Sequence, residues 1–207
     1  MSTFDRVSVR EESWRKVENQ GLRSNHKLPL LESDLEVRQS VEAIGTRLLC
    51  MSAAAAHAFG FPLAARAWIN QEGLGSDLSR AELQFLSGSE RKYLLAMQMQ
   101  VHSVYTLAWC VSLVSEFSVH GQMPDDLISR LPDLKRAEPS GPFRAKLALR
   151  PTQEMLIQLD LAYWAWRDAR LSLKRMDVNK ENLVEQRRKA LEWLMTGGTW
   201  DDVSLDT

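Results

Sequence analysis

The chain has 207 residues, of which 44% are hydrophobic and 26% are charged, and its formal net charge is −1 at pH 7. This composition excludes a disordered chain, and the balanced charge excludes an overall field that would recruit nucleic acid or an anionic membrane. The length fits one domain with a core of its own, with or without an appended arm.

The N-terminal part of the sequence predicts a polar arm followed by a long helix. A polar first helix is expected over about 9–20, inside an arm that covers residues 1–27. Ser33 and Glu36 fit a capping box, so a long helix is expected from about residue 34 to the stop at Gly60.

The middle of the sequence predicts short helices and then a buried central one. Short helices are expected after Pro62 and after Ser79, which forms a capping box with Glu82. The central helix is expected over about 90–119, and its part 93–115 contains no Asp, Glu, Lys or Arg. This part is long enough to span a bilayer, but six interrupting polar residues would be costly in lipid. They are Gln98, Gln100, His102, Ser103, Thr106 and Ser112. We therefore expect the central helix of a bundle and no membrane span.

Prolines mark residues 121–150 as a loop-rich connection with at most one short helix, near 125–131. Two further helices are expected over about 151–175 and 180–196, and an acidic tail covers 199–207. No segment alternates apolar and polar residues as a strand would. The predicted fold of residues 28–207 is therefore all-α, a single-domain irregular bundle of about six to eight helices around the buried central helix.

Motifs for metal binding, cofactor binding and nucleophilic catalysis are not recognisable in the sequence. Its four histidines are not spaced to share a helix face, and no acidic residue stands three positions before any of them. Cys50 and Cys110 lie in apolar stretches, and we interpret them as small buried hydrophobic residues. We therefore predict no metal and no cofactor.

The seven tryptophans of the chain divide into core and surface candidates. Trp68, Trp109 and Trp193 are expected in the core. Trp14 lies on the polar first helix beside Arg15, and it is a candidate for an exposed contact.

The densest polar cluster lies on the last two predicted helices. Arginines beside aromatic rings can stack on them and still offer a planar fork to a carboxylate or phosphate. The candidate binding residues are Asp160, Tyr163, Trp164, Arg167, Asp168, Arg170, Arg187 and Arg188. The favoured alternative is that these arginines are satisfied inside the protein by a tail clamp in which Trp200 enters the core. The residues of this tail clamp are Trp200, Asp201, Asp202 and Asp206.

Several motifs in the second half of the sequence occur together. They are Leu149-Arg150-Pro151, the run Trp-Ala-Trp-Arg-Asp-Ala-Arg over 164–170, the arginine pair at 187–188 with Ala190-Leu191 and Trp193-Leu194, and the closing run Trp-Asp-Asp-Val-Ser-Leu-Asp-Thr over 200–207. With these motifs the chain resembles, over roughly 28–207, a bacterial domain of unknown function, family 4272. The resemblance implies a bacterial origin and a cytoplasmic setting, but no mechanism. Members often carry a His just before the Trp-Ala pair, where this chain has Tyr163, so no role of that His is carried over.

Two classes of function remain open from the sequence. The leading hypothesis is a non-catalytic interaction protein of adaptor or immunity type, with a protein partner. The alternative is a small-molecule or nucleotide-binding protein, or an enzyme, that uses the Arg/Asp/Trp cluster on the penultimate helix. Nucleic-acid binding ranks lowest because the overall charge is balanced, and self-association is left open.

Overall fold

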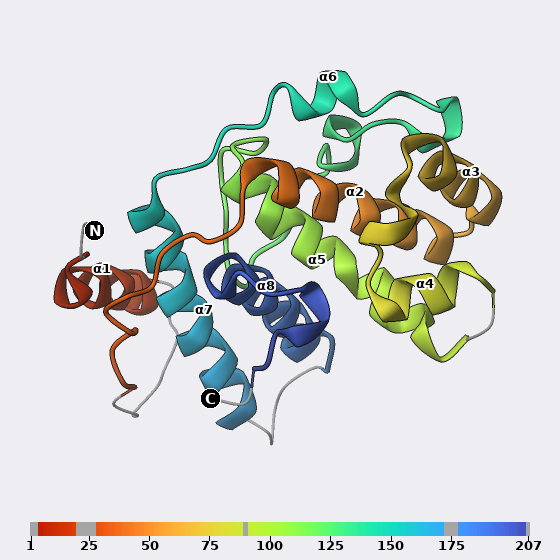
Figure 1. Cartoon of the computed structure of the whole chain (residues 1–207). Helices are drawn as coiled ribbons and strands as arrows, with labels where there is room; N and C mark the ends of the chain where they lie inside the picture. Colours follow the sequence, from red (N-terminus) through yellow and green to blue (C-terminus); the bar gives the residue numbers. More distant parts are fainter. Residues whose placement is uncertain (1–3, 20–27, 89–90, 172–177, 206–207) are drawn as a thin grey trace.

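The computed structural model describes residues 4–19, 28–88, 91–171 and 178–205, and in this part of the chain the fold is all-α, as predicted. Figure 1 shows its helices. They are α1 (Arg6–Asn19), α2 (Val41–Ala58), α3 (Pro62–Glu72), α4 (Arg80–Leu86), α5 (Leu94–Cys110), α6 (Gly141–Arg144), α7 (Thr152–Leu171) and α8 (Val178–Thr196). Short 3-10 helices are η1 (Leu74–Asp77), η2 (Arg91–Tyr93), η3 (Ile128–Arg130), η4 (Leu134–Arg136) and η5 (Trp200–Asp202).

The larger helices pack in a series that differs from their order in the sequence. Helix α3 packs on α2, α2 on α5, α5 on α8, α8 on α7, and α7 on α1. The same series runs across Figure 1, with α1 at one end of the molecule and α3 and α4 at the other. Helix α5 therefore occupies the middle, between α2 and α8, as the predicted central helix should.

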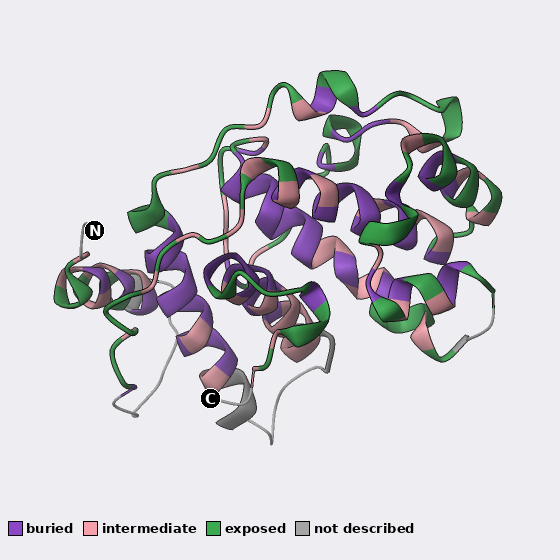
Figure 2. Cartoon of the chain, viewed as in Figure 1, coloured by how far each residue is buried: buried purple, intermediate pink, exposed green. Residues whose placement is uncertain are grey.

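Helix α5 is buried nearly all round in its second half, and Figure 2 shows buried residues along α5 and along α2 beside it. The predicted extension to residue 119 is wrong, because the helix ends at Cys110 and Ser112 adopts a left-handed conformation with φ 61°. The apolar run continues to Val119 because the irregular segment after the helix also packs into the core.

Helix α2 begins at Val41, so the start predicted near residue 34 is wrong. Ser40 is the N-cap, and its side chain accepts a hydrogen bond from the Ala43 amide at 3.2 Å. The chain before it runs along α8, where the Arg38 amide donates to the Leu194 carbonyl at 2.9 Å. The capping box predicted at Ser79 is confirmed on α4.

The connection from α5 to α7 crosses the molecule over α2 and α3 (Figure 1). It contains η3, inside the predicted short helix, and also η4 and α6, which were not predicted. At Gly45 of α2 a Cβ atom would lie 2.7 Å from Leu147 Cδ1, so the glycine allows the connection to approach. Trp68 Nε1 on α3 fixes the same connection by donating to the Glu138 carbonyl at 2.8 Å.

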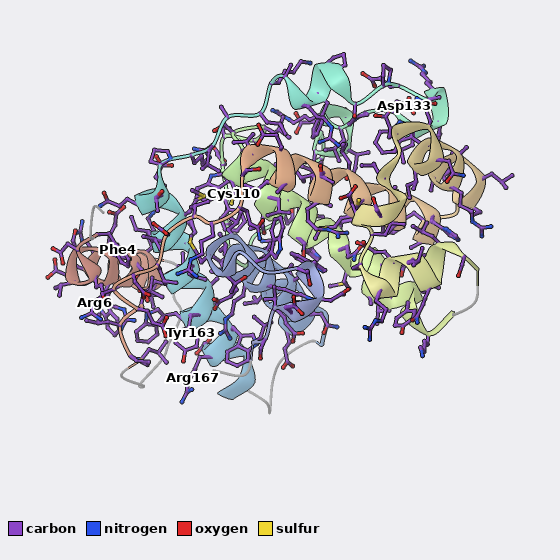
Figure 3. All side chains as sticks on the ribbon, viewed as in Figure 1. Phe4, Arg6, Cys110, Asp133, Tyr163 and Arg167 are labelled. Atoms are coloured by element: carbon purple, nitrogen blue, oxygen red, sulfur yellow. The ribbon has the colours of Figure 1, made fainter. Side chains whose placement is uncertain are left out.

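The predicted core residues are buried. Trp68, Trp109 and Trp193 belong to one hydrophobic cluster, and Cys50 and Cys110 are buried thiols without a disulfide. Cys110 lies near the centre of the molecule (Figure 3). Burial raises the pKa of Cys50 to about 12 and also raises that of Cys110. None of the helices in the described ranges has the length and apolarity that a membrane crossing requires.

Candidate functional site

Asp160 on α7 is the most buried carboxylate of the predicted cluster, and its partners come from the N-terminal helix. Arg10 of α1 donates to its two carboxylate oxygens from Nε at 2.9 Å and from Nη2 at 2.8 Å, and the Ser13 hydroxyl donates to it as well. The same guanidinium donates to the Leu28 carbonyl at 2.8 Å and to the Pro29 carbonyl at 2.6 Å. Asp160 therefore attaches α1 to α7 and is not available to a ligand.

Trp164 lies one turn further along α7, on the same side. Its ring meets that of Trp14 edge to face, with centroids 5.0 Å apart, and Arg10 Cζ lies 5.5 Å from its centroid. Trp14 is 40% exposed, so part of the Trp14 side chain faces solvent. The predicted surface tryptophan thus combines an exposed face with a packing role between α1 and α7.

Arg188 on α8 lies against the adjoining side of α7. Its Cζ is 4.8 Å from the Tyr163 ring centroid and 4.3 Å from that of Trp166. Its Nε donates to Glu192 Oε1 at 3.2 Å, and its Nη1 donates to the Leu205 carbonyl at 3.4 Å. Stacking and hydrogen bonding together fix this guanidinium inside the protein.

Arg187, the neighbouring residue, points to the other side of α8 and is fully buried. Its Nη1 donates to the Ser118 carbonyl and, at 2.8 Å, to the Gly121 carbonyl, while Cζ lies 4.9 Å from the Tyr105 ring centroid. Burial lowers the pKa of Arg187 to about 10. His102 Nδ1 lies 3.3 Å from Nη2 and accepts from it, and burial followed by the charge of Arg187 lowers the pKa of His102 to about 4.

The remaining candidates lie toward the end of α7. Arg167 follows Tyr163 along the helix (Figure 3) and is half-buried, and its Nε is buried without a hydrogen-bond partner among the described residues. Asp168 is half-buried, and burial raises the pKa of its carboxyl group while the charge of His120 opposes that rise. The side chain of Arg170 lies outside the described residues. The structure therefore separates the predicted cluster onto different sides of α7 and α8.

Trp200 of the predicted tail clamp is buried against α8 and α2. Its ring meets that of Trp193 edge to face at 5.8 Å between centroids. Arg47 Cζ lies 5.7 Å from the Trp200 centroid, and Lys189 Nζ lies 4.8 Å from it.

The acidic residues beside Trp200 have other partners than the expected arginines. Asp201 accepts a hydrogen bond from the Arg80 amide at 2.9 Å, at the first residue of α4. Asp202 accepts from the Thr199 amide at 3.2 Å and from its hydroxyl at 2.7 Å, closing a capping box on η5. Asp206 lies outside the described residues. For Asp201 and Asp202, pairing with the cluster arginines is therefore wrong, because they bond to backbone amides and to a neighbouring hydroxyl.

A buried ion pair beneath Trp200 was missed from the sequence. Arg47 of α2 pairs with both carboxylate oxygens of Glu82 of α4, and both side chains are buried. Gln100 Nε2 on α5 donates to Glu82 at 2.9 Å, and Arg47 donates to the Asp77 carbonyl at 3.2 Å. The capping box singled out Glu82, but no sequence signal indicated Arg47, which is 35 residues away.

One arrangement recurs through the described part of the chain. An arginine stacks on an aromatic ring and donates to the backbone of an irregular segment, to a carboxylate, or to both. The arginine–aromatic pairs are Arg10 with Trp164, Arg47 with Trp200, Arg150 with Trp109, Arg187 with Tyr105, and Arg188 with Tyr163 and Trp166. We call these the internal arginines. They attach loops to helices, which is a structural role that the Arg/Trp pattern alone did not distinguish from ligand binding.

Two hollows lie beside these residues. A shallow one of about 360 Å³ is lined by Arg10, Glu11, Trp14 and Arg15 on α1. A polar one of about 450 Å³ lies between α8 and the tail, lined by Glu185, Lys189, Asp201, Asp202, Val203, Ser204 and Leu205. Among the residues that the structure describes, no three His, Cys, Asp or Glu side chains are grouped so that they could hold a metal ion.

The comparisons with known proteins identify a family but no activity. Residues 10–203 match the family described as Domain of unknown function (DUF4272). The match begins in α1, earlier than the start near residue 28 that the sequence motifs indicated. Neither the curated proteins nor the solved structures provide a match.

Proposed function

The chain belongs to the DUF4272 family, and we propose that it acts as a non-catalytic binding protein of adaptor or immunity type, with another protein as its partner. The setting that we propose is the bacterial cytoplasm, which the family resemblance of its sequence motifs implies.

The observation that carries the proposal is the internal use of the charged residues that looked most like a site. Asp160, Arg187 and Arg188 are each almost completely buried. Their carboxylate or guanidinium groups bond to other parts of the same chain. Polar groups that converge on a substrate normally line a pocket with unused donors or acceptors. Here the conspicuous polar chemistry stabilises the fold, so the recognition surface has to lie elsewhere.

Native mass spectrometry of the protein, purified in one gentle step from its own host, tests the proposal. We expect the mass of the chain plus one stoichiometric second protein. A bare chain at physiological salt and protein concentration would contradict the proposal, and a chain that carries only a small adduct would favour the second candidate.

That second candidate is the binding of a small anion, and it rests on Arg167. A half-buried guanidinium whose Nε has no acceptor among the described residues could donate a charge-assisted hydrogen bond to a carboxylate or phosphate ligand. A thermal-shift titration with inorganic phosphate, citrate and ATP tests this candidate. Binding would raise the melting temperature of the wild-type protein and not that of Arg167→Gln. Equal responses of the two proteins would contradict it.

A further inference from the structure

The end of the molecule farthest from α1 carries exposed apolar side chains on three helices. Phe59 follows α2, Phe61 precedes α3, Leu63 lies in the first turn of α3, and Leu94 and Leu95 begin α5. All are exposed, and Leu63 reaches 81%. We call this set the corner patch. Figure 1 shows the turn between α2 and α3 at that end of the molecule.

Backbone geometry places the parts of the corner patch beside one another. The turn at Gly60 is tight, since the Phe61 amide donates to the Ala56 carbonyl at 3.0 Å, and Phe59 and Phe61 therefore flank it. Gln98 Nε2 of α5 donates to the Ala58 carbonyl at 3.4 Å, which fixes the first turns of α5 at the end of α2. Leu94 and Leu95 lie about one turn before Gln98, so they stand at the same end of the α2–α5 pair as Phe59.

The core beneath the corner patch is complete without these side chains. Ala54, Ala58, Phe85 and Met97 form a separate buried cluster between α2, α4 and α5. The corner patch lies outside this cluster, and the exposure of its apolar side chains to water is energetically unfavourable. A group of exposed apolar side chains of this kind typically marks a surface that binds a partner.

Three cationic side chains lie near the corner patch. Lys135 of η4 places Nζ 3.8 Å from the Phe61 ring centroid, and Lys92 stacks on the neighbouring Tyr93 at 5.0 Å. Arg66 of α3 lies close enough to His57 of α2 for its charge to help lower the pKa of His57. Among the described carboxylates, Glu82 pairs with Arg47, Glu72 accepts from Ser140, and Asp133 accepts from the Lys135 amide and pairs with Arg136.

The charges around the corner patch narrow the choice of occupant. A second copy docked through a two-fold axis would bring Arg66, Lys92 and Lys135 against the same residues of its partner, and like charges repel. The formal net charge of −1 provides no field toward an anionic lipid surface, and three cations alone are too few for firm attachment. A segment that combines apolar side chains with Asp and Glu satisfies both the rings and the cations.

We propose that the corner patch is the docking surface for an acidic amphipathic helix of a partner protein. The proposal rests on the proposed binding function and names the surface and the partner class for it. The partner helix would place apolar anchors at i, i+3 or i+4, and i+7 on the corner patch and carry acidic residues beside them.

Site-specific photo-crosslinking in the native host tests the docking surface. A photoreactive amino acid replaces Leu63 in the full chain, and in a matched control it replaces Ile128 of η3, which is 64% exposed and lies outside the corner patch. We expect a crosslinked partner from position 63 and none from position 128. Mass-spectrometric mapping should place the crosslink in a segment with the acidic and apolar spacing described above.

A peptide copied from the mapped segment then provides the quantitative test. Leu63→Glu and the double variant Arg66→Glu/Lys135→Glu should each weaken its binding about tenfold or more, and Ile128→Glu should leave it within about twofold. Raising the salt concentration should weaken binding to the wild type and have less effect on the double variant. All these positions are exposed, so an unchanged melting temperature is expected and verifies the fold of each variant.

The alternative results are distinguishable. If native mass spectrometry finds no second protein, the binding function itself fails. If it finds one but the probe at position 63 crosslinks to a basic segment or to a second copy of this chain, the function stands and the docking surface is overturned. The same holds if only the control probe at position 128 gives a crosslink. Binding of the wild type to anionic vesicles with no peptide binding would also overturn it, in favour of a lipid surface.

Discussion

A guanidinium group keeps its positive charge in the protein interior and has five N–H donors that must be satisfied there. The internal arginines meet most of this requirement in two ways, and of their nitrogen atoms only Nε of Arg47 and Nε of Arg187 stay buried without an acceptor among the described residues. Arg10 and Arg47 each donate to both oxygens of one carboxylate, whereas Arg187 donates to backbone carbonyls. In each case an aromatic ring covers the flat face of the group. Lysine has neither the flat face nor the fork, so replacement by lysine would not be conservative here.

The pair between Arg10 and Asp160 should be critical for stability. Arg10→Met leaves a buried carboxylate without its counter-charge, and we expect the free energy of unfolding to fall by about 3–5 kcal/mol. The double variant Arg10→Met/Asp160→Leu should recover most of that loss, because it removes the unpaired charge. Urea denaturation measures both.

The matched control is the exposed pair of Arg136 with Asp133, which are 3.6 Å apart and where Arg136 is 87% exposed. Arg136→Met should change the free energy of unfolding by no more than about 1 kcal/mol. A loss that small for Arg10→Met would mean that Asp160 reaches water.

His102 should make the protein less stable in mild acid. Its pKa is about 4 in the folded protein, below the value of 6.5 for an unperturbed histidine. Between these two pH values the unfolded chain binds a proton that the folded chain does not, so stability is lost as the pH falls from 6.5 toward 4. The melting temperature of His102→Gln should decline less over this window than that of the wild type. If the melting temperatures of the two proteins fell equally with pH, protonation of His102 would not be linked to unfolding.

At the scale of elements, the described end of the chain joins several helices. Trp200 packs beside Trp193 of α8 and over Arg47 of α2, and Asp201 bonds to the first residue of α4. Gln39, just before α2, donates to the Gly198 carbonyl at 3.0 Å. The tail therefore fixes α8, α2 and α4 relative to one another.

Truncating the ring at the centre of this arrangement should show how much it contributes. We expect Trp200→Ala to reduce the free energy of unfolding by about 3 kcal/mol, since it leaves a cavity and exposes the Arg47 guanidinium. Trp200→Phe keeps a ring in place and should lose clearly less. Equal melting temperatures for wild type and Trp200→Ala would mean that the tail contributes nothing to the fold.

The helices were predictable to the extent that local signals define them. The capping box at Ser79 predicted α4 correctly, because all its hydrogen bonds lie within four residues. The end of α5 was not predictable, because its cause is distant. Arg150 donates to the Trp109 and Val114 carbonyls, and Arg187 donates to the Ser118 carbonyl from 69 residues away.

The candidate site shows the same limit. The sequence identified the residue types on α7 and α8 but not their partners, because helix spacing says nothing about what packs on each side. Asp160 is paired with a residue 150 positions earlier, and no local pattern could indicate that.

At the scale of the whole molecule, α2 and α5 form the centre, and each carries one buried thiol. The raised pKa of each thiol keeps it protonated at pH 8, and burial blocks reagents. We expect no reaction of the native protein with a thiol reagent at pH 8. In urea both cysteines should become reactive, and the urea midpoint of their labelling should equal the unfolding midpoint measured by tryptophan fluorescence. Earlier labelling of one of them would show that its helix opens before the rest.

The attachment of α1 to α7 has a consequence for synthesis on the ribosome. Chains grow from the N-terminus at about 5–20 residues per second, so Arg10 emerges many seconds before the carboxylate that it binds, which follows 150 residues later. During that time the nascent chain presents Val9 and Val17, both buried in the finished protein, without the surface that covers them. The polar side chains that dominate α1 suit this interval, because they keep the waiting segment soluble until its partner helix has been made.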